Sequence, residues 1–320
     1  MIRLIQNEWM KIFGKHSSWV YAVIIIVALF IGGILYQKFE PEPSENWKEE
    51  VEQEIEGIQF ELSNGDIDDS YREHLESQLK VKQEILKNNI NPKKITNWDY
   101  MKDIVIGITS LVTLFSVIIA SGNIAAEYSD GTIKQLLIRP HKRWKILLSK
   151  YITINLYSLF LLFVLIVSGY IIGSILFENG SFSEKTVIET YIQGGQDPII
   201  TTVGAQFVKG ILLYLPSLLI INTISFMLST LFKNQSLAVG VGIFVLFLNS
   251  VLGAILFSLL DRYEWFKYII FPHLDLQIYL YGNNYYDLLT LPFSLTILAV
   301  YYIIFMVLTF TYFQKRDITF

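Results

Sequence analysis

Cysteine is absent from this 320-residue chain, and only four histidines occur, at scattered positions. Without cysteine there is no disulfide, no thiolate nucleophile and no cysteine-ligated metal site, and histidines so far apart cannot form a metal cluster. We therefore expect no catalytic residue and no metal site, and redox chemistry is not expected.

Motifs for nucleotide binding and hydrolysis are also missing. No Gly-x-x-x-x-Gly-Lys-Ser/Thr sequence occurs, and Gly14-Lys15 lacks both the upstream glycine and the hydroxyl residue of that motif. The chain has no His-Glu-x-x-His sequence and no paired aspartates within its apolar segments, which argues against a membrane-embedded hydrolase. We expect a protein that is not an enzyme and that binds no cofactor on this chain.

The chain is rich in apolar residues: 52% of its residues are hydrophobic, and its mean hydropathy is +0.44. Its long apolar runs can each cross a hydrocarbon core roughly 30 Å thick at about 1.5 Å per helical residue. The first apolar run is too long for a cleaved signal peptide, and the residues on either side of it do not have the pattern of one. We predict an all-α polytopic membrane protein with six transmembrane helices in residues 18–36 and 104–313. The predicted spans are Ser18–Tyr36, Ile104–Ala126, Tyr151–Phe177, Phe207–Phe232, Leu237–Leu260 and Leu291–Phe313.

Lysine and arginine in the short loops predict the orientation, because cytoplasmic loops carry an excess of both. One side carries few acids and holds Arg3, Lys11, Lys15, the cluster in 134–150, Lys233, Lys315 and Arg316. The opposite loops are mostly acidic. We therefore expect a multi-pass protein of a cell membrane, bacterial in type, with both termini cytoplasmic. The basic residues are divided among short loops, so no nucleic-acid partner is expected.

Residues 1–17 are predicted to form a cytoplasmic helix that lies in the membrane interface. Ile2, Ile5, Trp9 and Ile12 recur at helical spacing, with polar residues between them. Two interpretations remain open: an anchor that only starts the first span, or an element that takes part in coupling.

Residues 37–103 are rich in Glu, Lys, Gln and Asn and are predicted to form an extracellular acidic helical hairpin. Trp47, Val51, Ile55 and Leu62 fall on one helical stripe, and residues 63–66 have the composition of a turn. The hairpin is either a vestibule or lid for a cationic or lipid-like substrate, or a solvated coiled-coil decoration.

Residues 261–290 are aromatic and are interrupted by Pro272 and Gly282. Aromatic rings with one polar end suit the outer interface. We predict short helices that re-enter the outer leaflet, the alternative being an aromatic belt on the surface.

The polar and basic segment 127–150 lies between two apolar runs. Asp130 and Gly131 are expected to end the preceding helix with a turn, and Thr132 can cap a short helix that stops before Pro140. Pro140 is predicted to start the next span helix. A short helix held between two spans suits the transmission of force.

Polar residues within the predicted spans are few. Asn155, Asn222 and Asn249 either pack between helices or line a translocation path. Ion-driven carriers generally need buried ionisable groups, and the spans contain almost none, so the driving energy is expected to come from elsewhere.

These features together resemble a known family. Residues 130–143 read D-G-T-x-K-x-L-L-x-R-P-x-x-R after Glu127 and are followed by Ser149-Lys150, which resembles the permease subunits of ABC-2 type exporters, including those of the bacitracin- and lantibiotic-resistance type. Residues 7–13 are similar to the interface helix with which those permeases begin. The acidic hairpin is a departure, because the smallest members lack it.

The resemblance implies a transport subunit whose motor is a separate ABC ATPase present in two copies, with ATP and Mg bound on that partner. A second permease, identical or related, completes the unit within membrane lipid. The expected cargo is an exported amphipathic substrate such as an antimicrobial peptide or a lipid-linked molecule. The alternative is a membrane sensor or scaffold that transports nothing. The coupling residues implied are Glu127, Asp130, Gly131, Thr132, Lys134, Leu137, Pro140 and Arg143.

Overall fold

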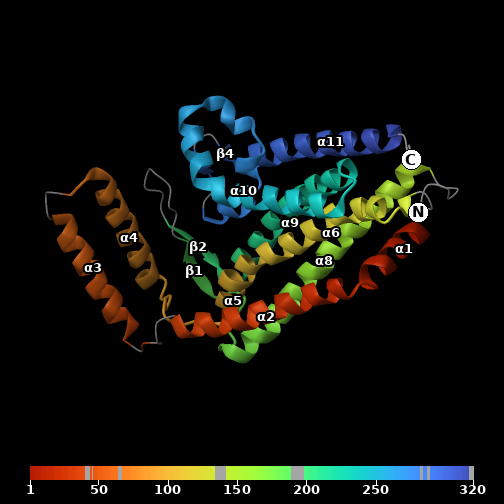
Figure 1. The fold of residues 1–320 in the computed structure, drawn as a ribbon. Helices are drawn as coiled ribbons and strands as arrows, with labels where there is room; N and C mark the ends of the chain where they lie inside the picture. The colour runs from red at the N-terminus through yellow and green to blue at the C-terminus, as the bar shows by residue number, and fades with distance from the viewer. Residues whose placement is uncertain are drawn as a thin grey trace.

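The computed structural model describes residues 1–39, 44, 46–63, 67–133, 142–188, 198–281, 284–286 and 289–316. Long helices form a bundle whose axes run roughly along one direction, with the N- and C-termini at the same end (Figure 1). The bundle helices are α1 (Ile2–Phe13), α2 (His16–Phe39), α6 (Ile106–Ser129), α8 (Arg143–Leu176), α9 (Val203–Leu231), α10 (Gln235–Arg262) and α11 (Leu291–Lys315).

Several of these helices are long and apolar enough to cross a membrane, which confirms a helical polytopic membrane protein. The 5 candidates are His16–Phe39, Asn97–Ser129, Arg143–Leu176, Val203–Leu231 and Leu291–Lys315. The predicted fifth span lies within α10, whose described apolar part, Gln235–Leu248, is shorter than a span. The number of six spans therefore stays a prediction.

The second candidate span begins earlier than its apolar run. It starts with α5 (Asn97–Tyr100) and the π-helix η1 (Met101–Val105), which continue into α6. Thr96 and Asp99 form a capping box: the Asp99 backbone N–H donates to Thr96 Oγ1, and the Thr96 backbone N–H donates to Asp99 Oδ2 at 2.9 Å. Because this cap satisfies free backbone groups, the helix can start before its apolar stretch.

Helix α6 lies inside the bundle and packs against α8, α9 and α10. The preceding turns approach α8 closely at glycines: a Cβ on Gly169 would lie 2.7 Å from Val105, and one on Gly173 would lie 2.9 Å from Tyr100. The Tyr100 hydroxyl donates to the Leu29 carbonyl at 2.9 Å and so joins α5 to α2. Small residues on α8 thus allow three helices to meet without a gap.

Helices α3 (Trp47–Ser63) and α4 (Asp69–Lys87) lie side by side at the end of the bundle opposite the termini (Figure 1). Trp47 and Val51 of α3 are buried against Val81 and Ile85 of α4. Residues 64–66, where the sequence predicts the turn, lie outside the described residues. The extracellular position of these helices stays a prediction.

Short strands amend the all-α prediction. Strands β1 (Lys185–Ile188) and β2 (Ile199–Thr202) pair antiparallel, with Lys185 opposite Thr202. Strands β3 (Asn284–Tyr286) and β4 (Leu289–Thr290) form a second small antiparallel pair. β-branched residues make up most of β1 and β2, which favours an extended backbone.

The aromatic segment between α10 and α11 contains short 3-10 helices, η2 (Glu264–Tyr268), η3 (Phe271–His273) and η4 (Leu276–Tyr281). Pro272 lies inside η3 and does not interrupt it, because proline at the start of a helix loses no hydrogen bond. His273 is buried, with Nδ1 2.8 Å from Ser294 Oγ and Nε2 2.8 Å from the Lys267 carbonyl. Gly282, the second predicted break, lies outside the described residues.

Candidate functional site

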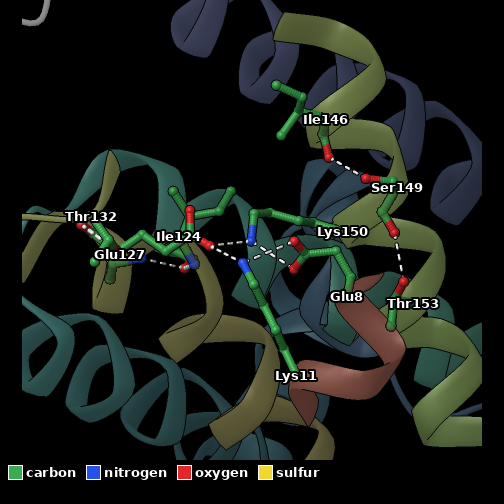
Figure 2. A network of polar contacts seen from close by, with 11 residues as sticks. Glu8, Lys11, Ile124, Glu127, Thr132, Ile146, Ser149, Lys150 and Thr153 are labelled. Atoms are coloured by element: carbon green, nitrogen blue, oxygen red, sulfur yellow. Dashed lines mark hydrogen bonds and ion pairs between the residues drawn. The ribbon is translucent and has the colours of Figure 1, made fainter. Parts of the chain in front are cut away.

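A buried network of charged side chains joins three helices at the end of the bundle that carries the termini (Figure 2). Nζ of Lys150, on α8, lies 2.8 Å from Glu8 Oε2 on α1 and 2.6 Å from Glu127 Oε1 on α6. Nζ of Lys11 lies 3.2 Å from Oε1 of each of the same two glutamates. Each carboxylate therefore contacts both ammonium groups. We call Glu8, Lys11, Glu127 and Lys150 the ion network.

Local structure fixes the α1 side of the ion network. Glu8 and Lys11 are three residues apart, which places them on one face of a helix. The Ser18 hydroxyl donates to the Ile12 carbonyl at 2.6 Å, and the Tyr157 hydroxyl donates to the Ser18 carbonyl at 2.8 Å. These buried hydrogen bonds tie the junction of α1 and α2 to α8. Glu8 is thereby directed toward Lys150.

Burial makes the pairing strong. The Lys150 side chain is 2% exposed and that of Glu8 is 7% exposed, whereas Lys11 is 46% exposed. Charges taken out of water are stable only when they are paired and hydrogen-bonded. Lys150 supplies a buried positive charge between two carboxylates, and Lys11 balances the remaining negative charge from the more open side.

The pKa shifts follow from this arrangement. Burial alone would raise the pKa of the Glu8 carboxyl, but the ammonium groups of Lys150 and Lys11 outweigh burial and hold that pKa below its ordinary value of 4.5. Burial alone would lower the pKa of Lys11, yet the carboxylates of Glu8 and Glu127 raise it above its ordinary value of 10.5. Both groups are therefore charged at neutral pH.

The predicted turn after Glu127 is confirmed. Helix α6 ends at Ser129, Asp130 is its C-cap, and Gly131 has a positive φ of 69°. Glycine suits that backbone because a Cβ is disfavoured there. The Thr132 hydroxyl donates back to the Glu127 carbonyl at 3.4 Å, so this turn stays next to the ion network.

Other connections converge on the same end of the bundle. The Gln235 backbone N–H at the start of α10 donates to Ser129 Oγ at 3.0 Å. Arg143 donates to the Gln314 and Arg316 carbonyls at 3.3 and 3.2 Å. The Arg316 guanidinium donates to the Thr230 carbonyl at 2.7 Å, which joins the end of α11 to α9. The beginning of α8 is thus tied to the C-terminal end of α11.

Among the described residues, the other predicted coupling residues do not join the ion network. Lys134, Leu137 and Pro140 lie outside the described residues. The prediction that Pro140 starts the next helix is wrong, because α8 begins at Arg143 after Lys142, whose backbone is extended. Asp130 and Arg143 are exposed. Residues 143–150 are therefore the first turns of a candidate span helix, α8, and Lys150 joins the ion network from these turns.

The asparagines in the spans make contacts between helices. Asn222 Nδ2, on α9, donates to Ser158 Oγ at 2.9 Å and to Asn155 Oδ1 at 3.3 Å, both on α8. This geometry fits the packing interpretation. Asn249 lies in α10, and its side chain lies outside what the structure describes.

Sequence reasoning missed Glu8, Lys11 and Lys150 as partners of Glu127. A signal was present: Glu8 and Lys11 lie beside the apolar stripe of Ile2, Ile5, Trp9 and Ile12, and Lys150 directly precedes a long apolar run. Opposite charges at the borders of different apolar segments favour pairing, because burial would otherwise leave them unpaired. The pattern does not say which charges meet. Across the described ranges, no group of three or more His, Asp or Glu side chains could hold a metal ion.

Comparison with known proteins places the chain in a family. The chain is 34% identical over 329 aligned positions to "Uncharacterized protein YhcI" of Bacillus subtilis (strain 168), covering 99% of both chains. It is 28% identical over 210 positions to "Uncharacterized membrane protein YdbK" of the same organism, covering 65% of this chain and 78% of that protein. The model of the family described as "Protein of unknown function (DUF2705)" matches residues 86–319. The chain therefore belongs to this family.

Proposed function

We propose that the chain is the transmembrane permease subunit of an ATP-driven ABC exporter, whose ATPase is a separate chain. The observation that carries the proposal is the ion network, which joins α1, α6 and α8 beside the segment that resembles a coupling helix. ATP and Mg would be bound by the partner. A homodimer or related heterodimer of permeases with two ATPases would form the working unit.

The contacts support a mechanical role for this end of the bundle. Residues 130–142 connect the end of α6 to the start of α8, and Glu127 and Lys150 bond these two helices directly at 2.6 Å. A force applied to the connecting segment would reach both helices at once, and Glu8 would carry it to α1. Such a rigid unit suits alternating access by rigid-body movement of helices.

The proposed topology has six spans, including α10, with both termini cytoplasmic. The positive-inside rule supports it, because Arg3, Lys11, Lys15, Lys233 and Arg316 belong to elements at the end that carries the termini (Figure 1). The acidic α3 and the charge-balanced α4 lie at the opposite end. In this orientation α1 is the cytoplasmic interface helix and α3 and α4 form the extracellular hairpin.

The cargo we propose is amphipathic, such as an antimicrobial peptide or a lipid-linked molecule, and the acidic α3 favours a cationic one. Neutralising the glutamates of α3 to glutamine should weaken the handling of cationic peptides, measured as the peptide concentration that cells tolerate. Equal tolerance with and without the substitutions would remove this part of the proposal. The glutamates are Glu49, Glu50, Glu52, Glu54, Glu56 and Glu61.

The proposal is tested by affinity purification of the detergent-solubilised chain from its native membrane. We expect a small ABC ATPase to co-purify, and we expect Leu137→Asp to remove it because the substitution puts a charge on the coupling segment. Phe60→Asp is the matched control, since Phe60 is 71% exposed on α3 at the other end of the bundle. No ATPase with the unsubstituted chain, or equal recovery with Leu137→Asp, would contradict the proposal.

The second candidate is a membrane sensor or scaffold that transports nothing. The pair α3 and α4, which extends beyond the bundle, favours it as a binding surface (Figure 1). The same purification distinguishes the two functions, because a sensor should recover a kinase and no ATPase.

A further inference from the structure

A cavity of about 450 Å³ lies next to the ion network, between α1, α2, α6, α8 and α10. Its volume is within the range of small-molecule sites, roughly 300–1,000 Å³. Along α6 its lining extends from Ile118 to the turn at Asp130, which spans about 18 Å at 1.5 Å per residue. The cavity therefore reaches from the end of the helix into the part of the bundle expected to lie in lipid.

Two hydrogen-bond acceptors on α6 are buried beside this cavity without a partner. Glu127 Oε2 and Asn123 Oδ1 have no donor within hydrogen-bond distance in the part of the chain that the structure describes. Both residues line the cavity, and they are one helical turn apart on the same face. A buried acceptor is normally satisfied, so this pair calls for a ligand with several N–H donors. A primary ammonium group has three.

The remaining lining indicates that the ligand also carries a negative charge. The carboxylates of Glu8, Glu127 and Asp130 are matched in number by the ammonium groups of Lys11, Lys15 and Lys150. Lys15 is exposed, and its ammonium group has no ion pair among the described residues. It can bind a phosphate at the open side of the cavity. A purely cationic ligand would leave Lys15 without an anion.

Apolar side chains form part of the wall. Ile12, Tyr21, Ile118 and Ile119 line the cavity away from the charged groups. Such a wall suits hydrocarbon better than it suits a fully water-soluble zwitterion. The cavity thus combines acceptors for an ammonium, a cation for a phosphate and apolar surface for a chain.

We propose that this cavity binds the headgroup of a zwitterionic phospholipid that carries a primary ammonium, the chemistry of phosphatidylethanolamine. The ammonium donates to Glu127 Oε2 and Asn123 Oδ1, the phosphate pairs with Lys15, and the acyl chains follow the apolar wall. Phosphatidylcholine has the same charges but no N–H donor, and phosphatidylglycerol has no cation. Both therefore bind more weakly. The site does not depend on the proposed transport activity.

The test is native mass spectrometry of the full-length protein released from nanodiscs that contain equal amounts of the three phospholipids with identical acyl chains. We expect phosphatidylethanolamine to be retained about tenfold over phosphatidylcholine, the effect of one charge-assisted hydrogen bond. Equal retention of these two lipids would overturn the proposal without any substitution. Displacement of the lipid by soluble phosphoethanolamine would overturn the assignment to a lipid.

Asn123→Leu locates the site, because it keeps the side-chain size and removes one acceptor without touching the ion network. We expect it to abolish most of the preference for phosphatidylethanolamine over phosphatidylcholine. Asn155→Leu is the control, since Asn155 lies on α8 and does not line the cavity. A preference that survives Asn123→Leu, or one that is lost equally in both variants, would contradict the placement.

Discussion

The two ends of the bundle use the same charged residue types for different purposes. At the end that carries the termini, Lys150 is 2% exposed and contacts two carboxylates from other helices. At the other end, Lys82 of α4 pairs with Glu54 of α3, and both side chains are partly exposed to water, at 30% and 50%. A buried pair depends strongly on its partner, whereas a surface pair contributes little. Charge alone therefore does not distinguish the two ends, but burial does.

Removing one cation from each end should show this difference most strongly. Lys150→Met leaves the largely buried Glu8 and Glu127 carboxylates with only the Lys11 ammonium group between them, and it should cost about 3–5 kcal/mol of unfolding free energy. Lys82→Met should cost about 0–1 kcal/mol, because water screens the Glu54 carboxylate. Reversible unfolding in detergent, followed by tryptophan fluorescence, measures both.

A second substitution checks the cause. Adding Glu8→Gln to Lys150→Met removes one of the two carboxylate charges that Lys150 balanced. The double variant should therefore recover part of the unfolding free energy lost in Lys150→Met. Additive destabilisation of the two changes would mean that the residues do not act as a network.

Replacing a glycine by alanine should change the unfolding free energy in opposite directions at the two ends. Gly131 has a φ of 69°, so Gly131→Ala should cost about 1–2 kcal/mol. Gly57 lies inside α3 with no other atom within 4 Å of an added Cβ. Gly57→Ala should stabilise by about 0.5–1 kcal/mol because alanine favours the helix. The same unfolding measurement applies, and a loss of stability in both variants would contradict the difference.

The smallest effect on stability is expected from changing the pH between 4.5 and 10.5, the ordinary pKa values of Glu8 and Lys11. The pKa of Glu8 is lowered from 4.5, so its contribution to stability is present above that value and is lost as the pH falls through its folded-state pKa. The pKa of Lys11 is raised from 10.5, so its contribution is present below that value and is lost as the pH rises through the folded-state pKa. The melting temperature difference between the unsubstituted chain and Glu8→Gln should therefore stay constant from about pH 5 to pH 9 and shrink below pH 4. A difference that changes steadily across neutral pH would show that another group titrates with the network.

The sequence predicts the helices well, because each long apolar run matches one of α2, α6, α8, α9, α10 and α11 and overruns it by at most two residues, and Gly131 marks the end of α6 as expected. Helix starts are less accurate: Pro140 suggests a start that the structure places at Arg143. Local rules describe where a helix can begin, whereas tertiary contacts such as those of Arg143 with the end of α11 select the start that is used.

The ion network could not be predicted as an assembly. Glu8 and Lys150 are 142 residues apart in the chain, and Lys11 and Glu127 are 116 apart. Their pairing depends on how α1 packs against α8, which depends in turn on the Tyr157 hydrogen bond to the Ser18 carbonyl. The sequence marks each charge as unusual without indicating its partner. The β1–β2 pair was missed for a similar reason, since its strands are short and belong to a long loop.

The central claim is that the ion network makes α1 and α8 move together when a partner ATPase binds ATP. Pulsed electron–electron double resonance, which measures the distance between two spin labels, tests this claim directly. Because the chain has no cysteine, labels can be attached at Met10→Cys on α1 and Trp144→Cys on α8. Met10 is 63% exposed and Trp144 is 39% exposed. In complexes diluted with unlabelled chain, the account predicts that ATP leaves the distance between these labels unchanged. With a single label at Met10→Cys in each permease, ATP should change the distance between the two permeases by several ångströms. An ATP-dependent change within one chain, or none between chains, would contradict the account.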